Sequence, residues 1–333
     1  MFKQSMKRFT NITLGVVTAS IFFSCSNDSM LERDSNEMKV VSLAKSSSRA
    51  SLLPVALNNW MSGLQDNISI SKISIPGTHD SGARIDAPVV SGTAKTQDLS
   101  IAEQLNAGVR FLDIRCRHIN NAFAIHHGSI YQNMNFDDVL NACYAFLQSN
   151  PSETIIMSVK EEYDASNTTR SFEETFDSYV QKNPSKWDLG ANIPTLGAVR
   201  GKIKLFRRFS SGATKGINAS PWADNTTFDI NNSGVQLKVQ DYYKVTNNDD
   251  KWNGISSLLN EAKTDNTNGK LFVNFTSGYK PGIFGIPSIP TVSNNINPRL
   301  KTFFQTNTQG SFGIMPIDFL NAELSQLIVN TNF

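Results

Sequence analysis

The chain has few cysteines, little net charge and no long apolar stretch. Its 333 residues include three cysteines, with 31 basic against 29 acidic side chains and a formal net charge of +2. A nearly neutral chain lacks the broad basic face that binds a nucleic-acid backbone, so nucleic acid is not an expected partner. The longest uncharged apolar stretch is too short to span a bilayer. These features leave an ordinary globular protein with one large domain or two small ones.

Two of the cysteines, Cys116 and Cys143, lie in the body of the chain and form no CxxC pair. That spacing argues against a structural zinc site. A disulfide between them and a pair of buried free thiols are both compatible with the sequence.

The third cysteine, Cys25, ends a pattern typical of a secretory signal. Basic residues near the start precede 13 uncharged residues, Ile12 to Ser24, and Cys25 follows directly. The uncharged stretch has the length of a signal peptide and is too short for a spanning helix. The small residue before Cys25 resembles the lipobox of bacterial lipoproteins, which predicts lipidation of Cys25. An ordinary signal peptide with an incidental cysteine is the alternative.

The lipobox interpretation divides the chain into three parts. Residues 1–24 are then a signal peptide, and 25–54 form a lipidated Ser-rich tether without a sustained apolar period. Residues 55–333 form the folded domain. We therefore expect an exported lipoprotein anchored to the outer membrane or the cell surface through Cys25, or released from it.

The folded domain is predicted to be a single (β/α)₈ TIM-type barrel, irregular or incompletely closed. Short β-branched or aromatic runs alternate with helical patterns, and a barrel of this class needs about 250 residues. Helices are expected at 101–105, 136–147 and 172–180. The expected strands are 72–75, 109–114, 123–125, 154–159, 203–206, 235–239, 271–275 and 312–317.

Polar side chains stand at the downstream end of every expected strand. In a closed parallel barrel all strand ends open on one face, so these side chains would meet at one mouth. Loop polarity explains any single case, but it does not select His, Asp, Arg and Lys at the strand boundaries. The residues are Thr78, His79 and Asp80; Asp113 and Arg115; His126 and His127; Lys160; Arg207 and Arg208; Asp241, Tyr242 and Tyr243; Asn274 and Thr276; and Asp318.

Two histidines of this set suit a general base and a general acid. His79 precedes an aspartate, and His127 ends another expected strand. His118 lies in what reads as a turn, and a packing role is expected for it. Asp113 and Asp318 could each hold a histidine through its second ring nitrogen.

Arg115 and Lys160 would supply fixed positive charge for a phosphoryl oxygen. The combination of a base, an acid, their carboxylates and fixed cations predicts phosphodiester cleavage that needs no metal or other cofactor. A metal site is the alternative, although Arg115 stands where the ligands of a metal ion would have to cluster.

Several segments closely resemble the bacterial phosphatidylinositol-specific phospholipase C family. The resemblance covers about residues 55–333. Its first two motifs are shared with eukaryotic relatives, and the later ones are similar to the secreted bacterial branch. The motifs are SIPGTHDSG at 74–82, FLDIR at 111–115, IHHG at 125–128, NPSETIIMSVK at 150–160, GKI at 201–203 with Arg207 and Arg208, VQDYY at 239–243, NFTS at 274–277 and IDF at 317–319.

The resemblance implies a role for each matching residue. His79 matches the base that takes the proton of the inositol 2-hydroxyl, with Asp318 as its partner. His127 matches the acid that protonates the departing diacylglycerol oxygen, supported by Asp80 and Asp113. Arg115 matches the arginine that contacts the phosphate, and the residues matching those that bind or stack on inositol are Lys160, Arg208, Asp241 and Tyr243. The family's products are diacylglycerol and inositol 1,2-cyclic phosphate, which is opened more slowly to inositol 1-phosphate.

The sequence departs from the family pattern at two places. Cys116 stands where a glycine commonly follows the phosphate-binding arginine, so the backbone must tolerate a Cβ there. The rim segment 282–290 is aliphatic where the secreted branch carries aromatic residues. We expect Ile283, Phe284 and Ile286 to form an interfacial loop, with packing under the barrel rim as the alternative.

Three functions are carried forward from these observations. The first is a monomeric phospholipase C that meets phosphatidylinositol, or glycosyl-phosphatidylinositol, at a membrane surface. The second is a metal-dependent glycerophosphodiesterase on the same type of barrel. The third is an inositol-lipid-binding module without catalysis, which the presence of a base, an acid and a phosphate cation disfavours.

Overall fold

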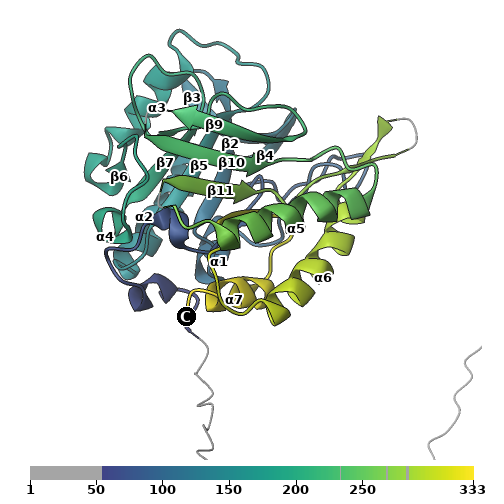
Figure 1. The fold of residues 1–333 in the computed structure, drawn as a ribbon. Helices are drawn as coiled ribbons and strands as arrows, with labels where there is room; N and C mark the ends of the chain where they lie inside the picture. Colours follow the sequence, from purple (N-terminus) through teal and green to yellow (C-terminus); the bar gives the residue numbers. More distant parts are fainter. Residues whose placement is uncertain (1–54, 233, 268, 283–284) are drawn as a thin grey trace, which may run out of the picture. The chain divides into compact units, whose positions relative to one another are not determined.

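Parallel strands curled around a common core form the central sheet (Figure 1). The computed structural model describes residues 55–232, 234–267, 269–282 and 285–333. In the central part of the sheet, each strand runs parallel to its neighbours, as in a TIM-type barrel. In sheet order they are β7 (Ile203–Arg208), β5 (Ile155–Glu161), β2 (Phe111–Ile119), β1 (Ile75–Thr78), β14 (Ile314–Ile317), β11 (Lys270–Asn274) and β10 (Val235–Gln240).

The barrel is not fully closed, as the sequence predicts. β6 (Trp187–Asp188) and β8 (Ile217–Asn218) pair with β7 at one edge, and β9 (Thr227–Asn232) pairs antiparallel with β10 at the other. Within the described ranges no ladder joins β8 to β9. A side-chain hydrogen bond crosses the gap instead, from Asn232 Nδ2 to the Asn218 carbonyl at 2.6 Å.

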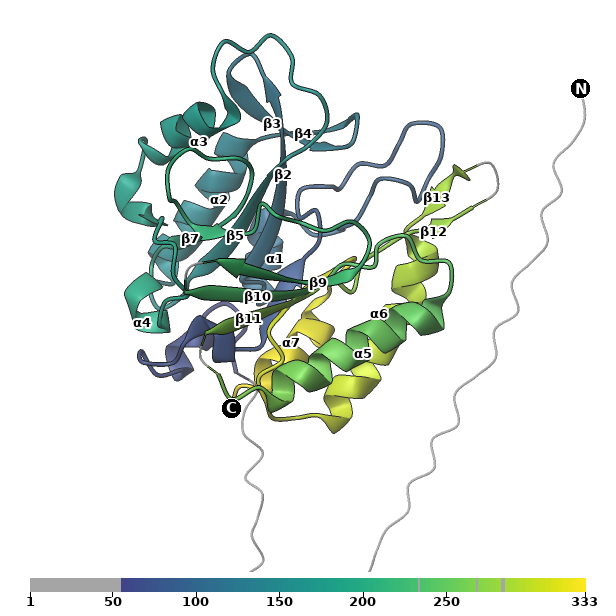
Figure 2. The ribbon, with the colours of Figure 1, turned by 45° about the horizontal axis from the view of Figure 1, so that its top comes forward.

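The third predicted barrel strand belongs to a hairpin outside the barrel. β3 (Ala122–His127) pairs antiparallel with β2 and with β4 (Ile130–Asn135). β2 is long enough for both duties, because residues 111–116 pair with β5 and residues 116–119 pair with β3. Asn120 and Asn121, both with positive φ, make the tight turn between β2 and β3. Figure 2 shows the hairpin extending beyond the central sheet.

The three predicted helices are present. α2 illustrates their origin: Phe136, Val139, Leu140 and Cys143 recur at helical spacing on its buried face, and a capping box from Asn135 opens it. Further helices follow the later strands. The bounds are α1 (Ile101–Asn106), α2 (Phe136–Ser149), α3 (Phe172–Val180), α4 (Leu196–Val199), α5 (Asn248–Thr264), α6 (Pro290–Thr306) and α7 (Ala322–Asn330).

The first strand begins later than predicted. Residues Ile70–Lys72 form a 3₁₀ turn, whose N-cap Ser69 accepts a hydrogen bond from the Ser71 amide, and β1 begins at Ile75. Other short elements are the 3₁₀ turns Trp60–Gly63 and Pro184–Lys186 and a hairpin of β12 (Lys280–Pro281) and β13 (Pro287–Ser288).

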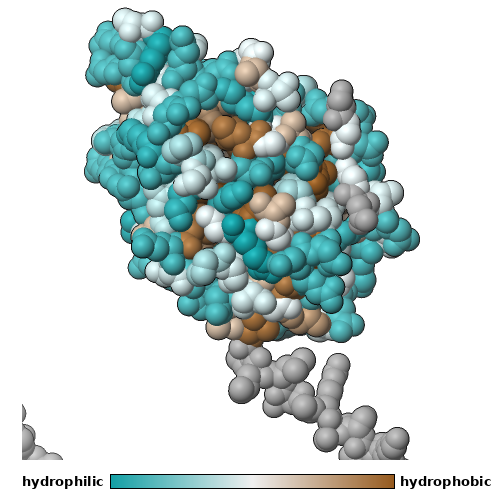
Figure 3. All heavy atoms as spheres, turned by 90° about the vertical axis from the view of Figure 1, so that its left-hand side faces the viewer, coloured by the Kyte–Doolittle hydropathy of each residue, from teal (hydrophilic) through white to brown (hydrophobic). Residues whose placement is uncertain are grey.

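The core lies between the strands and the surrounding helices. Residues 155–159 of β5 are all buried, because one face looks into the barrel and the other against helices. On the side of α3 and α4, apolar side chains show mainly in hollows between hydrophilic ones (Figure 3). Among the described residues, no helix combines the length and apolar character needed to cross a bilayer.

Candidate active site

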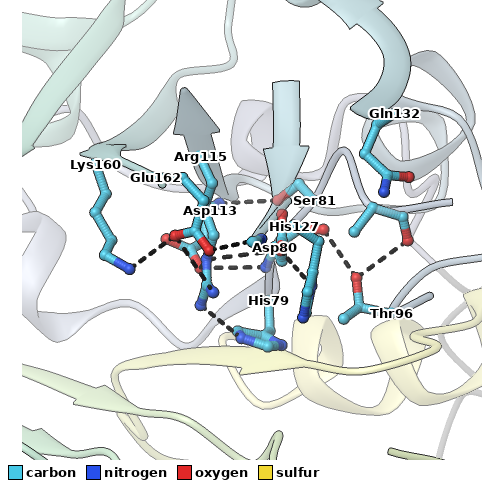
Figure 4. A network of polar contacts seen from close by, with 12 residues as sticks. His79, Asp80, Ser81, Thr96, Asp113, Arg115, His127, Gln132, Lys160 and Glu162 are labelled. Carbon is cyan, nitrogen blue, oxygen red and sulfur yellow. Dashed lines mark hydrogen bonds and ion pairs between the residues drawn. The ribbon is translucent and has the colours of Figure 1, made fainter. Parts of the chain in front are cut away.

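The strand ends meet at a pocket of about 590 Å³. Its walls come from β2, β5 and β7, from the hairpin strand β3, and from segments that follow β1, β10 and β11. Side chains from distant parts of the chain therefore meet at one mouth. The predicted residues that line it are His79, Arg115, His127, Lys160, Arg208, Asp241 and Tyr243. Figure 4 shows the polar network on its floor.

His79 follows β1 and is held at both ring nitrogens. Nδ1 lies 2.7 Å from Asp318 Oδ1, and Nε2 lies 2.7 Å from Arg115 Nη2. The guanidinium can only donate, so Nε2 accepts and the ring proton resides on Nδ1, facing the carboxylate. The lone pair of Nε2 is therefore directed into the pocket.

His127 is paired with Asp80. The Nδ1 atom lies 2.7 Å from Asp80 Oδ2, a charge contact whose orientation is not that of a hydrogen bond. Asp80 is fully buried and has a φ of +37°, an uncommon value for a residue with a Cβ. Its amide donates to Asp113 Oδ2 at 3.1 Å, which helps to hold this conformation at the site.

Two expectations about this pair of histidines need correction. His127 lies on the antiparallel hairpin strand β3 rather than on a barrel strand. Among the described residues, Asp113 has no hydrogen bond or ion pair with either histidine. Its carboxylate instead accepts from the Asp80 amide and from the Ser158 hydroxyl at 3.1 Å, and it lies 3.3 Å from Arg115 Nε. It positions the arginine rather than an imidazole.

Arg115 sits among three carboxylates. Asp113, Asp80 and Glu162 lie 3.3, 3.8 and 3.9 Å from its guanidinium. Burial alone would raise the pKa of Asp113, but the charges of Arg115 and Arg208 outweigh it and hold that pKa well below its usual range. The described residues contain no group of three or more His, Cys, Asp or Glu side chains arranged to hold a metal ion.

Glu162 is a site residue that the sequence reasoning missed. Its Oε2 accepts from Lys160 Nζ at 2.9 Å, and its Oε1 accepts from the Gly128 amide, beside His127. Burial would raise its pKa, but Arg115 and Lys160 lower it to about 2. Glu162 directly follows β5 and lies two residues after Lys160, so its place at a strand end was the available signal.

Trp222 was missed as well. Its indole Nε1 donates to Asp241 Oδ2 at 2.9 Å, and the Arg208 guanidinium lies 3.6 Å from the centre of its ring. It thereby joins two of the predicted substrate-binding residues. Because Trp222 lies in a loop between β8 and β9, no periodic pattern marked it.

The remaining predicted substrate-binding residues are at the pocket wall. Burial and the charge of Arg115 lower the pKa of Lys160, while Glu162 opposes that shift. Burial also lowers the pKa of Arg208. Tyr243 donates its hydroxyl to Asp224 Oδ1 at 2.6 Å, on the rim.

The other histidines and the cysteines lie outside the pocket lining. His118 is on β2 rather than in a turn, and its buried ring packs against Phe123 and bonds to the Thr175 hydroxyl. Cys116 and Cys143 are free, fully buried thiols, so the alternative of a disulfide is wrong. The Cβ of Cys116 is accommodated in the apolar core.

The expected interfacial loop is described in part. Ile283 and Phe284 lie outside the described residues, as do Cys25 and the whole of 1–54. Ile286 is described and is 43% exposed. It stands next to Pro287, which lines the pocket.

Taken together, the geometry is that of an acid–base phosphotransfer site. Each of two histidines has a carboxylate at Nδ1, and the partly buried Arg115 guanidinium lies among carboxylates in the same pocket. The class is an α/β-barrel phosphodiester-cleaving enzyme.

Comparisons with known proteins specify the class further. The family model described as phosphatidylinositol-specific phospholipase C, X domain, matches residues 73–209. A 1-phosphatidylinositol phosphodiesterase of Staphylococcus aureus strain Newman is 38% identical over 275 residues, which cover 78% of this chain and 88% of the relative. One from Listeria monocytogenes is 30% identical over 289 residues, covering 84% and 86%.

Solved structures agree with the sequence matches. The F249X mutant of the Staphylococcus aureus phosphatidylinositol-specific phospholipase C superposes with a TM-score of 0.75 at 36% identity, covering 84% of this chain and 99% of that one. The Listeria monocytogenes enzyme gives 0.70 at 26% identity, covering 84% and 100%. The chain therefore belongs to the bacterial phosphatidylinositol-specific phospholipase C family.

Proposed function

We propose that the protein cleaves phosphatidylinositol without a metal ion, giving diacylglycerol and inositol 1,2-cyclic phosphate, with slower hydrolysis to inositol 1-phosphate. Glycosyl-phosphatidylinositol carries the same diester and is a second substrate of the proposal. The observation that carries it is the environment of His79, whose Nδ1 is bound by Asp318 and whose Nε2 faces Arg115 in the pocket.

His79 is the general base of the proposed reaction. Its Nε2 lone pair accepts the proton of the inositol 2-hydroxyl, and Asp318 stabilises the imidazolium that forms. Gly278 supports the carboxylate, because its amide donates to Asp318 Oδ2 at 3.2 Å. A Cβ at Gly278 would come within 2.9 Å of the Tyr243 carbonyl oxygen, so the close backbone approach requires glycine.

Arg115 stabilises the phosphate. In the structure its guanidinium donates to His79, and a bound phosphodiester would offer it a charged acceptor instead. Asp113 fixes the Nε edge, which leaves the other edge of the guanidinium directed at the pocket. Negative charge on the phosphoryl oxygens is then met by a cation that is already oriented.

His127 is the general acid. It protonates the diacylglycerol oxygen as the P–O bond breaks, with Asp80 holding Nδ1. Because the 2-hydroxyl attacks the phosphorus of its own molecule, the first product is cyclic. Intramolecular attack of this kind can be worth an effective molarity of about 10⁵–10⁸ M. Water opens the cyclic product in the slower step, with the two histidines exchanging roles.

The inositol ring is held by the remaining wall of the pocket. Lys160 and Arg208 donate to ring hydroxyls, Asp241 accepts from them, and Tyr243 offers a ring face. Trp222 keeps Arg208 and Asp241 in place by its ring face and its indole N–H. Paired cations and carboxylates of this kind suit a polyhydroxylated ring.

The decisive experiment follows the products of the purified protein on phosphatidylinositol with a chelator present. We expect diacylglycerol in the lipid phase and a cyclic phosphate signal by phosphorus NMR, before the signal of inositol 1-phosphate. Loss of activity in the chelator, restored by a divalent metal, would instead support the glycerophosphodiesterase. Binding without product would support the lipid-binding module.

The rim of the pocket is the proposed membrane-contacting surface. Val89 is 93% exposed and Ile286 is 43% exposed. Their loops are joined by a hydrogen bond from the Ile289 amide to the Gly92 carbonyl at 2.9 Å, and both loops line the pocket through Thr93, Pro287 and Ile289. The two exposed apolar side chains therefore belong to loops that are joined to each other and that both contribute to the pocket wall.

Replacing Val89 and Ile286 with Ser should lower activity on phosphatidylinositol vesicles about 100-fold, because each buried apolar side chain contributes about 1.5 kcal/mol or more to membrane insertion. Hydrolysis of soluble inositol 1,2-cyclic phosphate should stay unchanged. An equal loss on both substrates would refute the interfacial role.

The proposed lipid on Cys25 would keep this rim at a membrane. A single acyl chain binds reversibly, whereas the two-signal anchor of a lipoprotein holds firmly. The exported wild-type protein should partition into the detergent phase, and the Cys25→Ser variant should remain in the aqueous phase. A Cys25→Ser variant that still entered the detergent phase would contradict the lipid anchor.

A further inference from the structure

Lys251 is a buried cation that the reaction does not use. It lies in the first turn of α5, which packs against β10 and β11 (Figure 1), and its side chain is almost completely buried. Nζ donates to the Phe275 carbonyl at 2.6 Å and to Gln240 Oε1 at 3.2 Å, which are both uncharged partners. Burial lowers the pKa of Lys251 to about 7, although Asp241 and Asp318 oppose the shift.

The two acceptors do not need Lys251 as a donor, so hydrogen bonding to them does not explain why a lysine is buried here. The Phe275 carbonyl also accepts from Gln240 Nε2 at 2.8 Å, and Gln240 Oε1 also accepts from the Tyr242 amide at 2.7 Å. Both acceptors would keep a donor if Lys251 were lost. A buried ammonium with only neutral partners, at the positive end of a helix, is a cost to folding.

The residues of the two acceptors adjoin residues that line the substrate pocket. Gln240 ends β10 and precedes Asp241, while its hydrogen bond to the Tyr242 amide shapes the turn that leads to Tyr243. Phe275 follows β11, and its ring packs edge-on against Trp222, with centres 5.7 Å apart. Trp222 in turn donates to Asp241. Lys251 is therefore linked to Asp241 in two ways: through Gln240, and through Phe275 and Trp222.

We propose that Lys251 is a positioning residue: its ammonium clamps the end of β10 to the end of β11, and so sets Asp241 and Tyr243 for the inositol ring. This inference rests on the proposed function. His79 also touches Phe275, with ring centres 6.0 Å apart, but its orientation is set independently by Asp318 and Arg115. The clamp therefore acts on inositol binding rather than on proton transfer.

The test compares Lys251→Met with the wild type on soluble inositol 1,2-cyclic phosphate. We expect KM to rise about 10-fold, from the loss of the two hydrogen bonds that Nζ donates, and kcat to stay within about threefold. The affinity for myo-inositol, measured by calorimetry, should fall by the same factor. The Tm should hold or rise, because the buried charge is removed.

The matched control is Lys263→Met, which removes an exposed lysine from the same helix and should change none of these values. If Lys251→Met does not fold, Lys251→Gln is judged by the same criteria. An unchanged KM, or a fall in Tm with KM unaltered, would overturn the inference. Absence of cleavage by the wild type would overturn the proposed function instead.

Discussion

The His79→Ala variant should cleave phosphatidylinositol about 10⁴-fold more slowly than the wild type, measured as kcat for release of diacylglycerol. A positioned base contributes about 10²–10⁴-fold, and His79 Nε2 lies 2.7 Å from the guanidinium that is to bind the phosphate. Its Tm should stay close to that of the wild type, because the ring is at the pocket surface rather than in the core.

His118→Ala is the matched control and should behave in the opposite way. That ring is buried between Phe123 and Phe172, so its loss should cost about 2–4 kcal/mol of stability, while kcat below the Tm should be retained. Substantial turnover by His79→Ala would remove the base assignment.

His127→Ala is expected to lower kcat on phosphatidylinositol about 10³-fold, and to do so selectively. Diacylglycerol is a poor leaving group and needs a proton, whereas p-nitrophenol leaves readily as the anion. On a p-nitrophenyl ester of inositol phosphate the loss should therefore be about 10-fold or less. Initial rates on both substrates make the comparison.

Asp80→Asn tests the support of that acid. It keeps the shape of the side chain but removes the charge that faces His127 Nδ1 at 2.7 Å. It should show the same dependence on the leaving group, with a smaller effect. Equal losses on the two substrates in either variant would mean that His127 has a role other than protonating the leaving group.

The barrel was largely predictable because its strands are buried on both faces. Residues 155–159, for example, are apolar except for Ser158, and such nearly continuous apolar runs suit a parallel sheet that helices cover. The hairpin strand β3 resembles a barrel strand in the sequence because the middle of β3 is as apolar as the barrel strands. The Asn120–Asn121 pair was the signal for a two-residue turn, and it was read as a longer turn around His118.

The candidate site was predictable where a side chain directly follows a strand. His79 directly follows β1, and Arg115 and Lys160 lie near the downstream end of the parallel pairing between β2 and β5. Contacts between side chains could not be derived in the same way. Asp113 holds Arg115 rather than a histidine, and Trp222 enters from a loop, because three-dimensional packing decides which neighbours a buried carboxylate or indole meets.

The two proton-handling groups have separate architectural origins. The base and its carboxylate directly follow β1 and β14, which pair with each other inside the barrel. His127 arrives on a hairpin that pairs with the outer end of β2, beyond the part held by β5. Substitutions in the hairpin can therefore alter which alcohols are expelled without disturbing ring closure, so evolution could retune one half of the chemistry while conserving the other.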